Sequence, residues 1–222
     1  MLGTTATPTS RLLAASVVPA ALVVAAAGGV ILVTAGLRPA MLAVSLVAAV
    51  VLGAWGCRRP HPVAAVTAAA VVVLAALITS DPLAGLAAAG LGAAAGVDLA
   101  ERRIPTTIAY GTTILCVAAA AGSLAGGRMS LTTPWFSTGV VVAIYAGLWM
   151  VGGVGFGDVR LAAATVSGAE AGLRYVAVMV AVPLLVLPVI AIGWRLARRR
   201  PPVPYGPALV AGWLVALSGL GS

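Results

Sequence analysis

Two aspartates, Asp98 and Asp158, are the residues of this sequence best placed to do chemistry. Each stands beside a long apolar run, where a carboxylate is costly and therefore marks a functional site. Two carboxyl groups held close together do not easily both ionise, so they tend to share one proton. The ionised group can take a proton from water while the protonated group donates to a carbonyl oxygen. Asp98 and Asp158 are therefore a candidate catalytic pair for amide hydrolysis without a metal ion, a cofactor or a covalent intermediate.

Glycines surround the second aspartate. Gly152, Gly153, Gly155 and Gly157 fill four of the six positions before Asp158. Glycine lets the backbone bend sharply or come close to another group. We expect this stretch to let a substrate backbone lie against the carboxylate.

The composition sets the class of protein that must position these groups. The 222 residues are 62% hydrophobic and 8% charged, with a mean hydropathy of +1.14, whereas soluble domains carry roughly 25% charged residues. The continuous runs of Ala, Leu, Val and Gly predict an all-α, polytopic transmembrane helix bundle. The net charge of +8 comes from arginines clustered between apolar runs, which indicates membrane topology and contact with the lipid bilayer, not nucleic acid.

Nine apolar segments are recognisable, and about seven to nine of them are expected to enter the membrane. They cover residues 12–33, 41–55, 63–79, 83–97, 107–124, 134–151, 159–166 and 174–194, with a last one ending near 220. The first run also resembles a signal peptide with a cleavage site near 25–27, but it continues to spanning length. We assign 1–82 to N-terminal segments of unassigned role and 83–222 to a catalytic membrane domain.

The positions of the arginines predict the orientation of the bundle. The positive-inside rule places Arg11, the pairs 58–59 and 102–103, and the cluster 195–200 in the cytoplasm. This alternation requires the short segment 159–166 to cross, or nearly cross, the membrane. Asp98 and Asp158 are separated by two crossings, so both should lie at the cytoplasmic face.

Short motifs predict local structure. Asp81 and Pro82 suit an N-cap followed by a first helical position. Gly92 and Gly96 form a small-xxx-small pair that permits close helix packing, although the motif is weak in so alanine-rich a chain.

The remaining reactive side chains have simple structural interpretations. Cys57 and Cys116 have no metal-ligand spacing and are interpreted as small hydrophobic residues. His61, the sole histidine, is interpreted as a solvated loop residue.

Structural roles for the two aspartates must be weighed as well. Asp98 could pair with Arg102 at a helix end, worth only about 0.2–0.5 kcal/mol. Asp158 could simply cap the helix that follows it. The glycine context and the shared membrane face of the two residues favour a functional pair.

Three motifs resemble the prepilin peptidase family, also called type IV leader peptidases, which are bacterial GxGD aspartic proteases of the membrane. Residues 155–160, Gly-Phe-Gly-Asp-Val-Arg, match the GxGD signature followed by a basic residue. Asp98, followed by the basic stretch and Ile-Pro at 102–105, matches the other aspartate motif. Residues 204–207, Pro-Tyr-Gly-Pro, resemble the family's Pro-Phe-Gly-Pro.

The resemblance implies an inner-membrane endopeptidase that cuts the basic leader of a type IV prepilin or pseudopilin at the cytoplasmic face, as part of protein secretion or pilus assembly. Asp98 and Asp158 would be catalytic. Gly155, Gly157 and Arg160 are our candidates for substrate binding.

The departures from the family pattern leave both carboxylates in place. Thr106 stands where the family usually has Asp or Asn, Arg160 where it has Lys, and Tyr205 where it has Phe. Longer members carry a methyltransferase domain with CxxC pairs, which this sequence lacks, so we expect a peptidase without methyltransferase activity.

Other functions compete with this interpretation. A transporter or channel subunit would also use intramembrane carboxylates, although internal repeats are not evident. An inactive scaffold for pilus assembly would keep the same fold. A serine protease is disfavoured because Gly-x-Ser-Gly is absent, and a dinucleotide site because the glycines follow an apolar span instead of a strand.

Overall fold

The computed structural model describes residues 38–57, 61–79, 81–125, 132–166, 173–197 and 203–218, and all regular structure in this part of the chain is helical. The helices are α2 (Arg38–Gly56), α3 (Pro62–Ile78), α4 (Pro82–Glu101), α5 (Thr106–Ala125), α6 (Thr132–Met150), α7 (Phe156–Val166), α8 (Leu173–Leu196) and α9 (Gly206–Leu217). The predicted all-α bundle is confirmed. The first predicted segment, 12–33, and its cleavage site lie outside the described residues.

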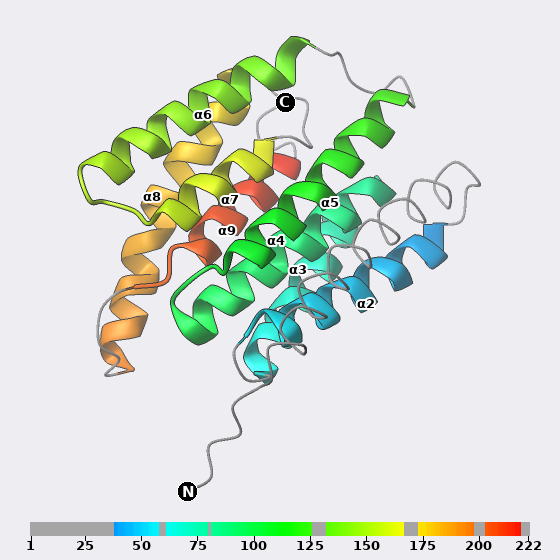
Figure 1. Ribbon diagram of the computed structural model, residues 1–222, viewed down its shortest axis with the longest axis horizontal. Coiled ribbons are helices and arrows are strands. Elements are labelled where there is room, and N and C mark those ends of the chain that lie inside the picture. The colour runs from blue at the N-terminus through cyan, green and yellow to red at the C-terminus, as the bar shows by residue number, and fades with distance from the viewer. Residues whose placement is uncertain are drawn as a thin grey trace, which may run out of the picture.

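Helix α4 is the centre of the bundle. In Figure 1 it runs among α2, α3 and α5 on one side and α7 and α9 on the other, and it packs against all five. Within α4, 89% of the segment Leu83–Glu101 is buried inside the molecule, against 17% of Arg174–Leu196 in α8. The reason is composition, because α4 consists largely of Ala and Gly and lets neighbouring backbones approach from every side.

The predicted small-residue pair lets α3 approach α4 closely. A Cβ on Gly92 would lie 2.9 Å from the Ala68 carbonyl oxygen of α3, and one on Gly96 would overlap the backbone of Ala64. On the other side of α4, the Thr112 hydroxyl of α5 donates a 2.9 Å hydrogen bond to a main-chain carbonyl. Close packing at both glycines is confirmed.

The start of α4 also forms as predicted. Asp81 is the N-cap, its carboxylate accepts a 3.1 Å hydrogen bond from the Leu83 amide, and Pro82 occupies the first turn. The end differs from the prediction, which closed the apolar segment at Val97. The helix continues to Glu101 and is capped by Arg102 in the left-handed conformation, with φ 56°, so Asp98 lies in the last helical turn.

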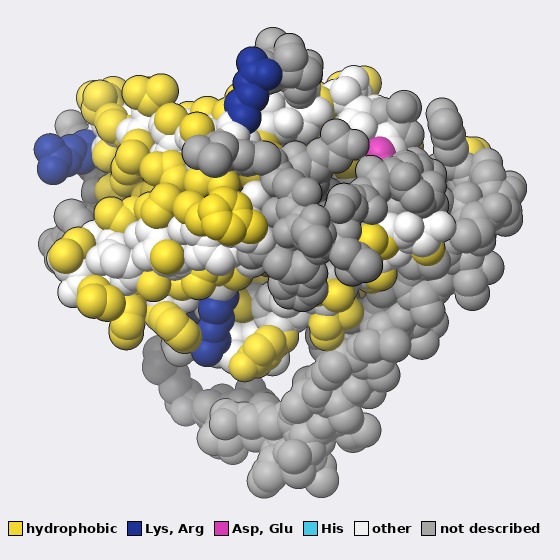
Figure 2. All heavy atoms as spheres, turned by 90° about the horizontal axis from the view of Figure 1, so that it is seen from above, with side chains coloured by type: hydrophobic (Ala, Val, Ile, Leu, Met, Phe, Trp, Pro, Cys, Tyr) yellow, Lys and Arg dark blue, Asp and Glu magenta, His cyan; other side chains and the backbone are white. Residues whose placement is uncertain are grey.

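Among the residues that the structure describes, three helices are long and apolar enough to cross a membrane by length and composition: Pro39–Gly56, Leu83–Glu101 and Arg174–Leu196. Figure 2 views the molecule from above. On this face, hydrophobic side chains cover much of the surface that the described residues form, with few arginines among them. Cys57 and Cys116 are both buried thiols outside any disulfide, as their interpretation as small hydrophobic residues requires.

Candidate active site

Three helix ends meet around the two aspartates. Asp98 lies in the last turn of α4, Asp158 in the first turn of α7, and Gly206 opens α9. Helix α7 packs against both α4 and α9, and α4 packs against α9. The sequence argument placed the two aspartates at one membrane face; the tertiary structure adds that their helix ends are in contact.

Asp98 is held by the chain's C-terminal part. It is only 6% exposed, and its Oδ2 accepts a 2.8 Å hydrogen bond from the Gly206 amide. This amide belongs to the first turn of α9, whose free N–H groups favour a negative partner. Arg102, the partner considered from sequence, has its guanidinium carbon 5.8 Å from the centre of the Trp194 ring.

Asp158 is held by its own turn. Its Oδ2 accepts a 2.9 Å hydrogen bond from the Gly155 amide, which is the arrangement of an acidic residue reaching back to the helix N-cap. The capping role considered from sequence is therefore real. The same side chain is partly accessible, and Gly155 beside it is exposed, so the turn opens this carboxyl to the surroundings.

Helix α7, which carries Asp158, has 11 residues, about 16 Å at 1.5 Å per residue, and is not among the candidate membrane spans. The carboxyl of Asp158 interacts electrostatically with that of Asp98. Burial, and then the negative charge of Asp98, raise the pKa of Asp158 to about 6, against a smaller opposing effect of the Gly155 hydrogen bond. A carboxyl with this pKa keeps its proton at pH values where an exposed aspartate has lost it.

The glycines predicted to bind substrate approach the protein itself. A Cβ on Gly155 would lie 3.2 Å from Asp158 Oδ2, and one on Gly157 would lie 3.3 Å from Ile104 Cβ. The second contact brings the start of α7 against the Ile-Pro segment that follows α4. Glycine at these positions thus lets the two aspartate motifs pack against each other.

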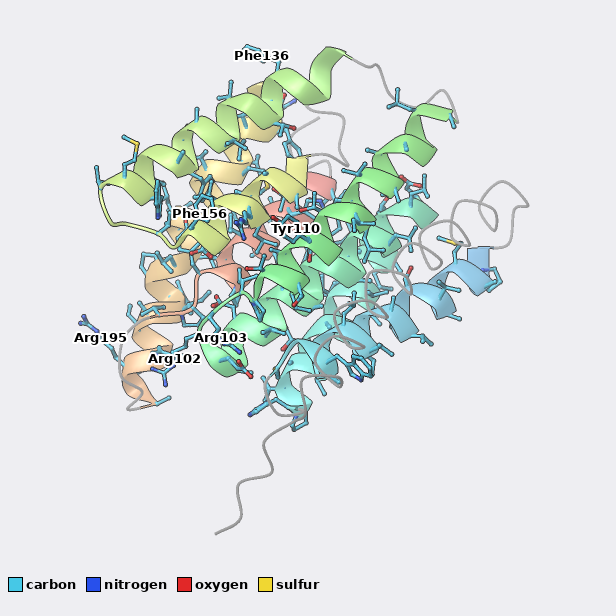
Figure 3. The ribbon with its side chains drawn as sticks, viewed as in Figure 1. Arg102, Arg103, Tyr110, Phe136, Phe156 and Arg195 are labelled. Carbon is cyan, nitrogen blue, oxygen red and sulfur yellow. The ribbon has the colours of Figure 1, made fainter. Side chains whose placement is uncertain are left out.

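Arg160 lies two residues beyond Asp158 on α7, among aromatic rings. Its guanidinium carbon is 4.6 Å from the ring centre of Phe156 and 5.6 Å from that of Tyr110 on α5. Figure 3 shows these two rings on neighbouring helices. Stacking of this kind fixes a guanidinium while leaving its edge free to donate hydrogen bonds.

Two residues of the site were not predicted as functional: Gly206 and Tyr205. The Pro-Tyr-Gly-Pro motif was the signal that pointed to them, but no feature of the sequence indicated which chemical group they meet. The Tyr205 side chain is 7% exposed and packs edge-on against Tyr145, with ring centres 6.1 Å apart.

Within the part of the chain that the structure describes, no three His, Cys, Asp or Glu side chains are grouped so that they could hold a metal ion. What the arrangement offers is a pair of interacting carboxyls, each hydrogen-bonded to a backbone amide, at one end of the bundle.

Comparison with known proteins adds one finding. A model of the type IV leader peptidase family matches residues 85–194, a range that contains both aspartates. No curated protein and no solved structure shows significant similarity to the chain.

Proposed function

Because the chain belongs to the type IV leader peptidase family, we propose that it is a membrane-embedded aspartic endopeptidase that removes the leader of type IV prepilins or pseudopilins. The observation that carries this proposal is the meeting of α4, α7 and α9 at the two aspartate motifs, where the Gly206 amide bonds to Asp98 and Gly157 packs against Ile104. A family of peptidases and a coupled carboxyl pair together favour acid–base hydrolysis over transport.

The proposed mechanism uses the pair as one unit. With a single proton between them, the ionised carboxyl takes a proton from a water molecule, and the water oxygen attacks the scissile carbonyl carbon. The protonated carboxyl donates to the carbonyl oxygen, which gives a tetrahedral diol. The carboxyl that took the water proton then passes it to the amide nitrogen, the C–N bond breaks, and a diol hydroxyl returns its proton to the other carboxylate, so that the pair again holds one proton. The Gly206 and Gly155 amides hold Asp98 and Asp158 in place during these transfers.

We assign substrate contacts to the turn around Asp158. Gly155 is exposed beside the Asp158 carboxyl and, without a side chain, lets an extended peptide backbone approach it, while Gly157 brings the start of α7 against Ile104. Arg160, steadied by the Phe156 and Tyr110 rings, is placed to donate to peptide carbonyls.

We place the site at the cytoplasmic face of the inner membrane. Support comes from Arg102 and Arg103 at the end of α4 and Arg195 at the end of α8, which lie at the same end of the bundle in Figure 3. Both groups belong to basic segments that the positive-inside rule assigns to the cytoplasm. Asp98 is one turn from Arg102 and shares that end.

The test is co-expression of the protein with a prepilin from its own genome, followed by gel separation of precursor and mature forms. We expect Asp98→Asn and Asp158→Asn each to lower the processing rate by at least about 100-fold, because each removes a proton-transfer group. Asp81→Asn is the matched control, since Asn caps a helix as well as Asp does and processing should continue. Full processing by either active-site variant would refute the aspartic mechanism.

A further inference from the structure

Helix α8 contains two prolines, Pro183 and Pro188. A proline has no N–H, so Pro183 cannot donate to the Met179 carbonyl four residues before it, as a residue in an uninterrupted helix would. Met179 is inaccessible, and its helix is one of the candidate membrane spans. A carbonyl freed in such surroundings is unfavourable unless another group of the protein donates to it.

Tyr145 of α6 supplies the donor. Its hydroxyl donates a 3.0 Å hydrogen bond to the Met179 carbonyl, and the residue is only 1% exposed. The proline itself packs against α9, where a Cβ on Gly212 would lie 2.9 Å from the Pro183 ring. This part of α8 is therefore tied to α6 and closely packed against α9.

The Tyr145 ring also lies next to the segment that holds Asp98. It packs edge-on against the ring of Tyr205, with ring centres 6.1 Å apart. Tyr205 is the N-cap of α9 and is followed directly by Gly206, whose amide donates the 2.8 Å hydrogen bond to Asp98. The contact uses the Tyr205 ring and not its hydroxyl, so a phenylalanine at that position would make it equally well. Tyr145 thus joins α8 to the start of α9.

We propose that Tyr145 is a positioning residue of the active site, which ties α6 to α8 at Met179 and supports Tyr205, so that the Gly206 amide stays on the Asp98 carboxyl. This inference rests on the proposed peptidase function. Tyr145 is buried and acts through the first turn of α9, not on the substrate. A carboxyl that loses its backbone partner can leave the geometry that proton transfer requires.

The experiment introduces Tyr145→Phe into two backgrounds of the purified full-length protein: the wild type and Pro183→Ala. In Pro183→Ala, the amide of residue 183 can donate to the Met179 carbonyl, so this oxygen keeps a donor when the tyrosine hydroxyl is removed. For each protein, kcat and KM for a prepilin and the thermal unfolding midpoint are measured.

Tyr175→Phe is the matched control. The Tyr175 hydroxyl donates a 2.7 Å hydrogen bond to the Thr165 carbonyl, near the end of α7 opposite Asp158. The control therefore removes a buried bond of the same kind, which also joins α8 to another helix, but away from both aspartates.

In the wild-type background, we expect Tyr145→Phe to lower the unfolding midpoint and to lower kcat by about tenfold, with KM changed less than about threefold. In the Pro183→Ala background the midpoint should no longer fall, because the Met179 carbonyl keeps a donor. There kcat should still fall about tenfold relative to Pro183→Ala itself, because the tie between α6 and α8 is lost. Tyr175→Phe should lower the midpoint and leave kcat unchanged below it.

A second measurement does not depend on activity. Hydrogen exchange of the Gly206 amide, followed by NMR with isotope-labelled glycine, should be at least about fivefold faster in Tyr145→Phe, because the bond to Asp98 opens more often. The Gly155 amide, which bonds to Asp158 within its own turn, is the internal control and should exchange at the wild-type rate.

The outcomes are distinct. Unchanged kcat in Tyr145→Phe, with active wild type and inactive Asp158→Asn, would overturn this inference and leave the peptidase function standing. Losses of kcat and midpoint that both disappear in the Pro183→Ala background would assign Tyr145 a structural role only and also overturn it. Unchanged exchange of the Gly206 amide would overturn it whether or not the wild type cleaves the prepilin. Absence of cleavage by the wild type would overturn the peptidase function, and this inference with it.

Discussion

The Gly206 amide donates a 2.8 Å hydrogen bond to Oδ2 of Asp98, joining the first residue of α9 to the last turn of α4 across 108 positions. This bond satisfies one free amide of the α9 N-terminus and one oxygen of a nearly inaccessible carboxylate. It also leaves little space, since a Cβ on Gly206 would lie 3.1 Å from the same oxygen. The first residue of α9 therefore belongs to the candidate active site.

Gly206→Ala tests this contact. The added methyl group requires the carboxylate or the start of α9 to move by a few tenths of an ångström, and a displacement of 1 Å near a reacting group can cost about 100-fold in rate. We expect prepilin processing to slow by about three- to tenfold. Gly139→Ala on α6 is the matched control, because a Cβ there meets nothing within 4 Å. Equal rates for the two variants would contradict the assigned role of Gly206.

The pH dependence of cleavage should report the proton shared by the carboxyl pair. Burial and the Asp98 charge raise the pKa of Asp158 to about 6, so Asp158 loses its proton as pH rises through that value. Since catalysis needs one proton on the pair, kcat/KM should fall above about pH 6, tenfold per unit.

The same pKa can be measured without activity. Titration of the Asp158 carboxyl by carbon NMR should give a lower pKa in Asp98→Asn than in the wild type, because the neighbouring negative charge is gone while burial remains. An unchanged pKa in that variant would mean that the two carboxyls are not coupled.

Arg160→Gln separates substrate binding from structural stacking. If the guanidinium contacts peptide carbonyls, KM for the prepilin should rise about three- to tenfold while kcat changes little. Phe156→Leu serves as the control, since it removes the ring 4.6 Å from the guanidinium but keeps the charge, and should raise KM less. A stability loss of about 0.5–1 kcal/mol with unaltered KM would leave Arg160 only its aromatic contacts.

The packing of α3 on α4 should depend on two glycines. Gly92→Ala and Gly96→Ala each force a methyl group onto the α3 backbone, and overpacking of this kind costs about 1–3 kcal/mol. We expect lower unfolding midpoints for both variants in detergent. Gly147→Ala on α6, with open space around the added methyl group, should be neutral or slightly stabilising. A neutral result at both α4 positions would show that the helices can separate without cost.

The family and the two aspartates could be recognised from the sequence because both depend on local patterns. Uninterrupted apolar runs permit little besides membrane helices, and the predicted segments agree closely with α2 to α9. Local chemistry also determined the Asp81 cap and, through two glycines at a spacing of four, the close packing of α3 on α4. The predicted segment ended at Val97, four residues before α4 ends at Glu101, because apolar content marks the membrane segment and not the capping residue, Arg102.

Only the tertiary structure decided which groups surround each carboxyl. The sequence predicts two membrane crossings between Asp98 and Asp158, which would put both at one face of the membrane. Counting crossings does not indicate that the start of α9 lies beside them. The bond from Gly206, the buried phenol of Tyr205 and the contact of Gly157 with Ile104 join segments distant in sequence. Such contacts follow from how helices pack around the small-residue surface of α4, and helix packing depends on the shapes of all neighbouring faces together.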